Sequence, residues 1–284
     1  MINALSFDVE EYFCVSNFEE FIKPQDWSNL ESRIEYQTYK VLDILSTFNA
    51  KATFFILGWV ASRHPNLIKE ICKRGHEIGV HTWWHRRIFT QSREEFRKEL
   101  KDTKSLLEDI IGQKIWGFRA PSFSLNKNCL WAVDILMEEG FKYDSSIFVK
   151  FLPKNLPSEF IKLTPFILKK TSSKVLWEFP LTTFKVGNIF LPISGGGYLR
   201  ILPYRLIKTL FKDINSIKKN PFLVYLHPWE IDVFQKIPPS IPYLKRKRHL
   251  IGIKSIEYKL ISLLRDFKFA SIKEVLEKEY AVKF

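Results

Sequence analysis

The sequence predicts an α/β fold in which a mostly parallel sheet is covered by helices. Short apolar stretches typical of buried strands alternate with longer amphipathic stretches, and this pattern runs from residue 3 to near residue 150. Such alternation builds parallel sheets, because each crossover helix returns the chain to the same edge. Of the 284 residues, 46% are apolar and 26% are charged, which suits one sizeable core and excludes a disordered protein.

The first half of the chain supplies the clearest elements. Ser92 followed by Glu95 is a capping box that begins a helix, and Gly112 ends it. Strand-like apolar runs occur at residues 3–8, 52–57, 77–81, 115–118 and 141–143. The other helical stretches of this half are residues 32–48, 65–73 and 127–139, the last two of which are followed by glycine at positions 75 and 140.

The pattern changes near residue 150. Residues 151–200 hold five prolines, a glycine triplet at 195–197 and β-rich pieces such as 175–179, so we expect long insertions near one rim of the sheet. Alternation then resumes with a helix over 203–217, a strand over 222–226, a helix over 255–266 and a capped helix from Ser271. No repeat or linker interrupts the chain, which predicts a single domain over residues 1–284, including a C-terminal extension after about residue 230.

The composition bears on the cellular location of the protein and on its partners. The three cysteines are far apart, which argues against a disulfide framework or a cysteine-based zinc site and favours a cytoplasmic protein. No apolar run approaches the roughly 18 residues of a membrane span, and no secretion signal is recognisable. The net charge of +13 favours an anionic partner, although a lysine-rich solvated surface explains it equally well. The basic run at residues 245–249 fits anionic glycan or lipid head groups, or a solvated loop.

The sharpest local motif is a pair of histidines, His81-Thr-Trp-Trp-His85. Two imidazoles four residues apart, in a turn after a strand, can point the same way and share one metal ion. A hydrolytic zinc site also needs at least one more ligand, usually a carboxylate. Because isolated pairs with this spacing are common, the two histidines by themselves do not establish a metal site.

Acidic residues follow the first strand directly. Alternate residues of an extended segment point to the same side, so Asp8 and Glu10 face one pocket while Val9 turns away. In parallel α/β folds, active sites gather at this end of the strands. Glu11 is either part of a solvated acidic turn or an alternative to Glu10 as the third ligand.

Arg119 and His227 also stand at the ends of apolar strands, in Phe118-Arg-Ala-Pro and Leu226-His-Pro-Trp-Glu. Each alone is more often structural, as an ion-paired arginine or a histidine bonded to backbone. With the acids and the histidine pair, they place polar groups at the same end of four strands, which favours one shared site.

In order along residues 6–230, the chain carries Ser-Phe-Asp-Val-Glu-Glu-Tyr-Phe, Ala-Thr-Phe-Phe, Gly-His-Glu-Ile-Gly-Val-His, Arg-Ala-Pro-Ser-Phe-Ser, Tyr-Asp-Ser-Ser and Leu-His-Pro-Trp-Glu. This ordered set resembles the polysaccharide deacetylase superfamily, the NodB-homology or carbohydrate esterase family 4 group. More narrowly, it resembles the exopolysaccharide-associated branch, which has an acid-x-acid first motif. The resemblance implies a distorted (β/α)7–8 barrel, here with β-rich insertions around residues 150–200.

The resemblance also implies a metal site. His81 and His85 match the family's metal-binding histidines. In most relatives the acid ligand directly follows the catalytic acid, but here that position is Val9, and Glu10 fills the ligand role as in the acid-x-acid branch. The implied cofactor is a divalent metal ion, most often zinc.

The resemblance also implies catalytic roles for residues that match the family's motifs. Asp8 matches the general base, Arg119 the arginine that pairs with the base, and His227 the general acid. The family's fourth motif is not clear in this chain, and Asp144 is the candidate acid that orients His227. These roles suit amide hydrolysis, in which a metal ion and a base activate water and an acid protonates the leaving amine.

Substrate contacts are expected from residues that flank these motifs. A backbone N–H after Pro121, such as that of Ser122, is a candidate donor to an oxyanion. Aromatic rings at Trp84, Phe123 and Trp229 can stack on a sugar ring, although core positions are equally compatible with their residue types.

The sequence therefore predicts a hydrolase that removes N-acetyl groups from amino sugars of a polysaccharide or its precursor, with an anionic glycan or lipid-linked precursor as a further partner. A related amidohydrolase acting on a small cyclic amide or ureide could use the same cleft. A non-haem iron oxygenase also uses two histidines and a carboxylate, but usually on an all-β fold. A non-catalytic basic binding protein is another alternative, and the chain has no nucleic-acid-binding motif.

Overall fold

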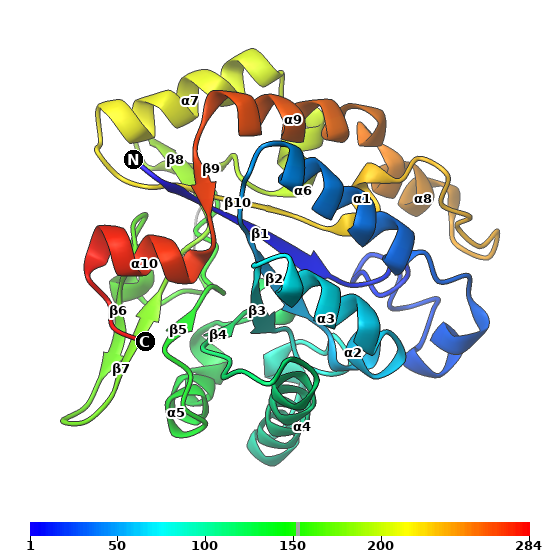
Figure 1. The fold of residues 1–284 in the computed structure, drawn as a ribbon, viewed down its shortest axis with the longest axis horizontal. Coiled ribbons are helices and arrows are strands. Elements are labelled where there is room, and N and C mark those ends of the chain that lie inside the picture. Colours follow the sequence, from blue (N-terminus) through cyan, green and yellow to red (C-terminus); the bar gives the residue numbers. More distant parts are fainter. Residues whose placement is uncertain (152–153) are drawn as a thin grey trace.

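The computed structural model describes residues 1–151 and 154–284 and contains a curled sheet with helices along its outer face (Figure 1). The sheet order is β10-β1-β2-β3-β4-β5-β7-β6, with β11 paired to β1, and β8 and β9 form a separate hairpin. The strands are β1 (Asn3–Val9), β2 (Thr53–Ile56), β3 (Glu77–Val80), β4 (Gly117–Phe118), β5 (Tyr143–Asp144), β6 (Phe166–Lys170), β7 (Val175–Glu178), β8 (Thr183–Val186), β9 (Ile189–Pro192), β10 (Leu223–Leu226) and β11 (Phe269–Ala270).

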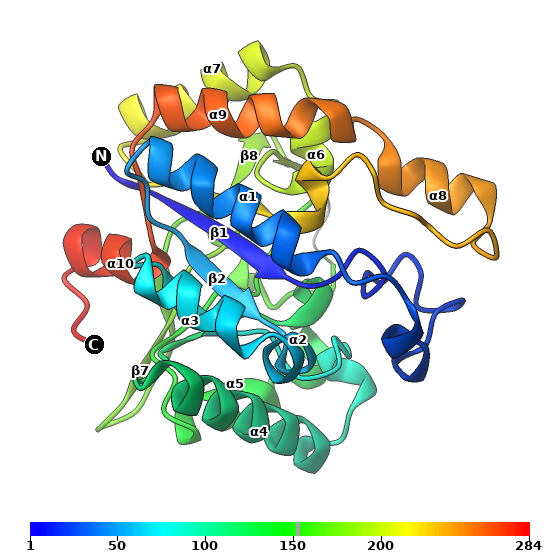
Figure 2. The same cartoon turned by 45° about the vertical axis from the view of Figure 1, so that its right-hand side comes forward.

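The helices lie around the sheet, with α1, α7 and α9 along one flank and α3, α4 and α5 along the other (Figure 2). Their bounds are α1 (Ile34–Thr47), α2 (Gly58–Arg63), α3 (Pro65–Lys73), α4 (Arg93–Ile111), α5 (Trp131–Glu138), α6 (Gly196–Ile201), α7 (Tyr204–Ser216), α8 (Tyr243–Leu250), α9 (Ile256–Asp266) and α10 (Ile272–Tyr280). The pairs from β10 to β7 are parallel, and β6 pairs antiparallel with β7 at the edge. This arrangement confirms the predicted α/β fold of the barrel type.

Most predicted elements are present, and local chemistry explains their ends. Ser92 Oγ accepts a hydrogen bond from the backbone N–H of Glu95 at 3.1 Å, and Gly112 adopts a left-handed φ of 67° after the last turn of α4. The predicted insertions appear as β6 to β9, and residues 152–153 of that stretch lie outside the described residues. The sequence reading missed the short helices α2, α6 and α8.

Both faces of β1 are buried, which makes this strand the centre of the molecule. Leu5, Phe7 and Val9 pack in the apolar layer between sheet and helices. Ser6 and Asp8, which alternate with them, point into the interior of the curled sheet, where both contact the side chain of Arg119. The strand therefore places the carboxylate of Asp8 in a buried position in the interior of the sheet.

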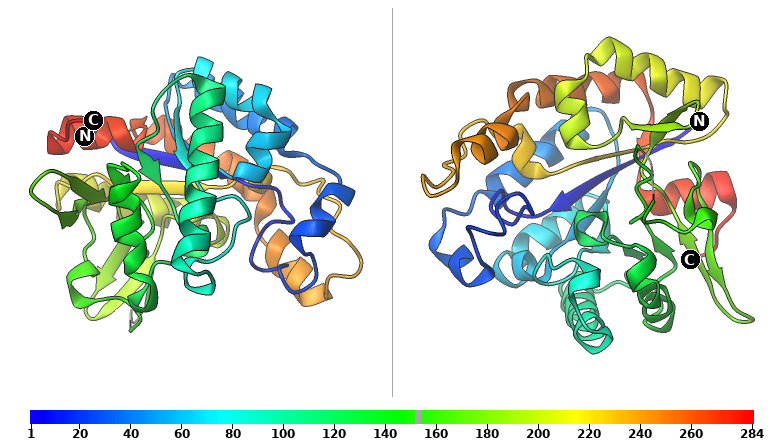
Figure 3. Two further views of the ribbon diagram at one scale, coloured as in Figure 1. Left: turned by 90° about the horizontal axis from the view of Figure 1, so that it is seen from below. Right: turned by 180° about the vertical axis from the view of Figure 1, so that it is seen from behind.

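The end of the sheet that carries the strands' N-termini is closed by α10. Glu77 accepts hydrogen bonds from Thr53 Oγ1 at 2.6 Å, Tyr143 Oη at 2.8 Å and the backbone N–H of Lys273 at 3.1 Å. These contacts fix the first turn of α10 against the sheet. Figure 3 shows α10 and α8 at opposite ends of the molecule. Because α10 covers the end that carries the strands' N-termini, the other end, where the strands' carboxyl ends lie, is available for a functional site.

The segment after residue 230 adds β11 to the same sheet, through parallel pairing with β1. That a single domain spans residues 1–284 stays a prediction. Within residues 1–151 and 154–284, no helix has both the length and the apolar character needed to cross a bilayer.

Candidate active site

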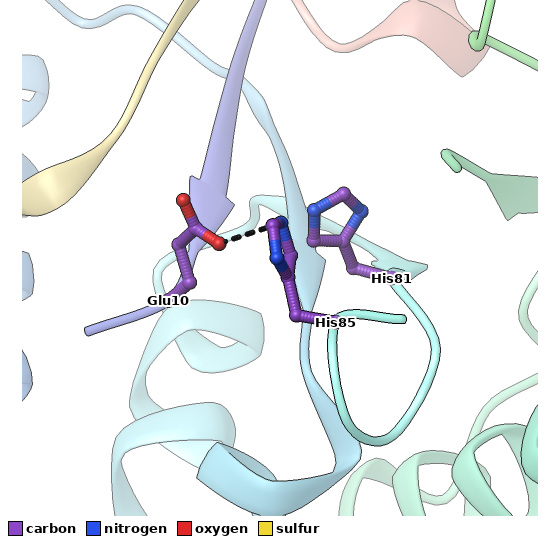
Figure 4. Close-up of side chains that lie close together, drawn as sticks. All are labelled: Glu10, His81 and His85. Atoms are coloured by element: carbon purple, nitrogen blue, oxygen red, sulfur yellow. Dashed lines mark ion pairs between the residues drawn. The ribbon is translucent and has the colours of Figure 1, made fainter. Parts of the chain in front are cut away.

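Two loops at the carboxyl ends of β1 and β3, which flank β2 in the sheet, bring three potential metal ligands together. Glu10 follows β1 directly, and His81 and His85 belong to the turn after β3. One ligand atom from each residue lies within 4.8 Å of the other two, and Figure 4 shows the three side chains converging. The predicted trio is therefore assembled in space.

The donor set fits a divalent metal ion. His81 Nδ1 lies 2.8 Å from the backbone oxygen of Arg119, so this nitrogen donates and its Nε2 keeps a free lone pair. Glu10 Oε2 is buried and accepts no well-aligned hydrogen bond, although His85 Nε2 lies only 2.9 Å away. Two imidazoles and a carboxylate with an unused oxygen are the ligands of hydrolytic zinc sites.

Protonation also favours ligation. Burial lowers the pKa of His81 to about 4, so this imidazole is neutral at pH 7. Burial alone would raise the pKa of Glu10, but the neighbouring His85, His227 and His81 lower it to about 2. A neutral imidazole and an ionised carboxylate are the forms that bind a cation.

Glu11, the alternative third ligand, points elsewhere. Its carboxylate accepts hydrogen bonds from the backbone N–H groups of Arg33 at 3.2 Å and Ile34 at 3.3 Å, and from the hydroxyl of Ser32. These contacts cap the start of α1. Glu10, rather than Glu11, therefore faces the histidine pair.

The loops that carry the site are conformationally unusual. Of the eight non-glycine residues with positive φ in the described chain, four lie in the loops after β3 and β4. They are Thr82 and His85, and Ser122 and Phe123, with φ between 54° and 61°. Such conformations cost about 1–3 kcal/mol each and are retained where the surrounding packing enforces them, often at functional sites.

Arg119 fixes Asp8 in the interior beside the ligand trio. Its Nη1 donates to Asp8 Oδ1 at 2.7 Å and to Ser6 Oγ at 2.8 Å, while Nε and Nη2 donate to Ser145 O and Oγ at 3.0 and 2.9 Å. The guanidinium is fully buried, and it stacks 4.2 Å from the centre of the Phe55 ring. Because Nε, Nη1 and Nη2 of Arg119 each donate a hydrogen bond, the guanidinium is fixed, and it holds the carboxylate of Asp8 in one orientation.

His227, after β10, also contacts the trio. Its Nδ1 is 3.1 Å from Glu230 Oε2, and its Nε2 is 3.3 Å from Glu10 Oε1. Burial alone would lower the pKa of His227, but the hydrogen bond with Glu230 and the charges of Glu10, Glu230 and Asp8 raise it to about 9. The imidazole is therefore protonated at neutral pH.

The expectation that Asp144 orients His227 is wrong. In the sheet order, four strands separate β5, which carries Asp144, from β10. Asp144 instead accepts a hydrogen bond from Ser146, and its neighbour across the ladder is Glu178. Burial raises the pKa of Asp144 to about 7, and burial with the charge of Asp144 raises that of Glu178 well above its usual range. Glu230 makes the contact that was assigned to Asp144.

The residues converge on a cavity of about 310 Å³. Of the five predicted substrate contacts, Ser122, Phe123 and Trp229 line it. Trp229 is buried, however, and its ring stacks against those of His227 and His249, with centroids 5.0 and 4.3 Å apart, so it cannot also stack on a sugar. The lining residues are Asp8, Glu10, Val15, Ser16, Asn17, His81, His85, Ser122, Phe123, Gly197, Arg200, Tyr225, His227, Trp229, Glu230, Arg248 and His249.

The two other predicted contacts lie outside this cavity. Pro121 is buried behind the loop after β4. Trp84 lines a separate groove beside α4, and its ring centre is 6.1 Å from that of Trp27. In both cases the residue belongs to a site motif, but its side chain turns away from the site.

Sequence reasoning missed Glu230 and Arg200. Glu230 accepts hydrogen bonds from both the backbone and the ring of His227, and its other oxygen lies 3.1 Å from Arg200 Nε. Gly196 permits this arrangement, since a Cβ atom there would lie 1.8 Å from Glu230 Oε2. The spacing of His227 and Glu230, three apart around a proline, was the available signal for the pair.

Two known families match separate parts of the chain. Residues 32–137 match the family described as Polysaccharide deacetylase, and residues 156–277 match a domain of unknown function, DUF3473. Peptidoglycan-N-acetylglucosamine deacetylase of Bacillus cereus is 37% identical over 98 residues, which cover 34% of this chain and 36% of that protein. Three such curated deacetylases match over only 23% to 41% of their own lengths.

Solved structures share the whole fold. A protein assigned as a polysaccharide deacetylase from Mycobacterium smegmatis has a TM-score of 0.62 at 22% identity, covering 98% of this chain and 89% of that one. A structure of the allantoinase Puue gives a TM-score of 0.62 at 14% identity, covering 98% and 90%. At these identities the likeness establishes the fold.

Proposed function

We propose that this chain, whose residues 32–137 match the polysaccharide deacetylase family, is a metal-dependent hydrolase that removes N-acetyl groups from amino sugars of a polysaccharide or its precursor. The observation that supports this most is the convergence of Glu10, His81 and His85 with two candidate acid–base groups, Asp8 and His227, on one cavity. The match of residues 32–137 to this family supports carbohydrate deacetylation, and the donor set supports metal dependence.

Glu10, His81 and His85 would hold the ion, with zinc as the best match to this ligand set. A divalent ion bound there polarises the acetyl carbonyl and makes water acidic enough to be deprotonated near pH 7. The chain's own contribution is to fix the ligands. The backbone oxygen of Arg119 does this for His81, by holding the proton on Nδ1.

Asp8 is the group that accepts a proton from the attacking water. It shares the cavity with the ligands, and its contact with Arg119 Nη1 keeps one carboxylate oxygen engaged in a hydrogen bond. A base with a fixed orientation accepts the proton along one direction, which favours attack from that side of the acetyl group. Arg119 is thus a positioning residue for Asp8.

His227 is the group that donates a proton to the departing amine nitrogen. Because the carboxylates of Glu230, Glu10 and Asp8 surround it, the imidazole retains its proton at neutral pH. The bond to Glu230 holds Nδ1 and aims Nε2 into the cavity. A protonated imidazole and a carboxylate in the same cavity match the two proton transfers of amide hydrolysis.

The volume of about 310 Å³ is at the lower end for small-molecule pockets, which suits one sugar unit with its acetamido group. Relatives named as peptidoglycan-N-acetylglucosamine deacetylases act on N-acetylated sugars of this kind. We further propose that the substrate belongs to exopolysaccharide assembly and that the reaction takes place in the cytoplasm. The acid-x-acid motif supports the first point, and the free state of Cys14, Cys72 and Cys129 supports the second.

Product analysis tests this proposal. Zinc-loaded protein is incubated with N-acetylglucosamine oligomers and, separately, with a cyclic ureide, and acetate, free amine and ring-opened product are quantified. We expect acetate and free amine in equal amounts, with Asp8→Asn as the matched inactive control. Ring opening of the ureide without acetate release would replace the proposal with the amidohydrolase alternative.

A further inference from the structure

Helix α8 presents an outward face made of apolar and basic side chains, which we call the α8 face. Tyr243 and Leu244, both large and apolar, are 65% and 76% exposed. Figure 2 shows α8 projecting from the body of the molecule, beside the loop that follows β1. The α8 face comprises Tyr243, Leu244, Lys247, Arg248, Leu250 and Ile251.

The opposite side of α8 is anchored, so the outward direction of this face is fixed. The ring of His249 stacks on Trp229 at 4.3 Å and lies 4.9 Å from that of Phe18. The backbone oxygen of Lys245 accepts a hydrogen bond from Asn17 Nδ2 at 3.0 Å. At 100° per residue, the members of the α8 face fall on the side of the helix away from these contacts.

The α8 face carries positive charge without compensation from its own helix. Residues 243–251 include Lys245, Arg246, Lys247 and Arg248 and no acidic residue. The nearest acids along the chain, Asp232 and Glu257, are paired with Arg33 at 2.5 Å and Lys40 at 2.6 Å. Glu20, from the loop after β1, is paired with Lys245 Nζ at 2.7 Å. The same holds for Glu31 with Lys236 at 3.2 Å and Glu19 with Arg87 at 2.8 Å.

A second apolar element precedes the helix in the chain. Phe234, in the segment between β10 and α8, is 71% exposed, and Val233 beside it is also exposed. Exposed aromatic and aliphatic side chains interspersed with lysine and arginine are the composition of surfaces that lie in a bilayer interface. There the apolar groups enter the acyl boundary while the cations contact lipid phosphates.

We propose that the α8 face, with Phe234, binds the surface of a membrane that contains anionic lipids. Charge complementarity selects this occupant, because a neutral apolar partner would leave Lys247 and Arg248 unpaired. Arg248 also lines the catalytic cavity, so a bound membrane would lie beside the cavity. The proposal concerns binding and does not depend on the proposed function.

Vesicle co-sedimentation tests the proposal. The full chain is mixed with vesicles of phosphatidylcholine alone or with about 30% phosphatidylglycerol, in low salt and in about 0.5 M salt. We expect binding to the anionic vesicles to be roughly tenfold tighter or more, and to weaken as salt screens the charges. The double variant Tyr243→Ser/Leu244→Ser should bind about tenfold more weakly, and Lys247→Gln should weaken binding only to anionic vesicles.

A matched control is available outside the α8 face. Tyr258 and Ile217 are 63% and 74% exposed, close to the values for Tyr243 and Leu244, but belong to α9 and the end of α7. Tyr258→Ser/Ile217→Ser should bind anionic vesicles like the parent. Melting temperatures of all variants confirm folding. Equal binding by both double variants, or no preference of the parent for anionic vesicles, would overturn the proposal.

Discussion

Glu230 accepts two hydrogen bonds from one residue, His227, whose backbone N–H lies 3.0 Å and whose ring Nδ1 lies 3.1 Å from Glu230 Oε2. This double contact fixes the imidazole against its own backbone and leaves Nε2 directed at Glu10, 3.3 Å away. The carboxylate therefore sets both the orientation and the protonation of the proposed general acid.

That relationship predicts a pH dependence. A pKa raised to about 9 means that His227 keeps its proton well above pH 6.5, so turnover should fall only as pH rises through this raised pKa. Glu230→Gln removes a charge that raises the pKa, and we expect the alkaline limb of kcat/KM to move down by about one pH unit or more. His227→Ala should remove that limb. Unchanged limbs in both variants would exclude His227 as the acid.

The Asp8–Arg119 contact predicts a separate loss. Asp8→Asn should lower kcat about 10²–10⁴-fold, since an amide cannot accept the water's proton, while zinc content stays at the parent's level. Arg119→Gln acts through the same carboxylate, so the double variant should lose less than the product of the two single losses. Retention of kcat within a few-fold in Asp8→Asn would rule out its role as base.

Substitutions of the adjacent residues Glu10 and Glu11 are predicted to affect metal binding differently. Glu10→Gln and His81→Ala should each weaken zinc binding by about tenfold or more, because a ligand is lost from a three-residue site. Glu11→Gln should bind zinc like the parent, because Glu11 caps α1 instead. Isothermal titration with zinc measures all three. Loss of zinc from the Glu11 variant with retention in the Glu10 variant would reverse the assignment.

Adjacent glycines give a stability test. A Cβ at position 196 would lie 1.8 Å from the Glu230 carboxylate, whereas one at Gly197 would meet its nearest atom at 3.9 Å. Gly196→Ala should therefore destabilise the protein by about 1–3 kcal/mol, and Gly197→Ala should leave it unchanged or more stable because alanine favours helix. Chemical denaturation compares the two, and equal stabilities would contradict the packing described.

Trp84 offers a negative prediction. Because its side chain lies in a groove beside α4 rather than in the cavity, Trp84→Ala should leave KM for an N-acetylated oligomer within about twofold of the parent. Phe123→Ala, which removes a ring from the cavity wall, should raise it. A large KM increase in the Trp84 variant would restore it as a substrate contact.

The sequence was most informative about polar residues that stand at the ends of apolar strands. Glu10, His81, Arg119 and His227 each follow an apolar strand, and Asp8 is the second-last residue of one. Parallel strands bring such positions to one edge whatever their order in the sheet. That general property is why one shared site could be predicted without coordinates, whereas the ligand role of Glu10 and the pairing of Arg119 with Asp8 came from the family resemblance.

Partners that depend on sheet order or side-chain direction could not be predicted. Asp144 and Glu230 were both available acids, and only the four strands between β5 and β10 exclude Asp144 as the partner of His227. Trp84 and Trp229 belong to site motifs, yet one turns outward and the other is stacked between imidazoles. The basic run at 245–249 gave no hint that its helix also exposes Tyr243 and Leu244.

The most direct test of the central claim is acetate release from an N-acetylglucosamine oligomer, measured while zinc is titrated into the metal-stripped protein. The account predicts no release without zinc, a linear rise with added zinc and a plateau at one ion per chain, with Glu10→Gln showing no rise over the same range. Full release by the metal-stripped parent, or none at saturating zinc, would contradict it.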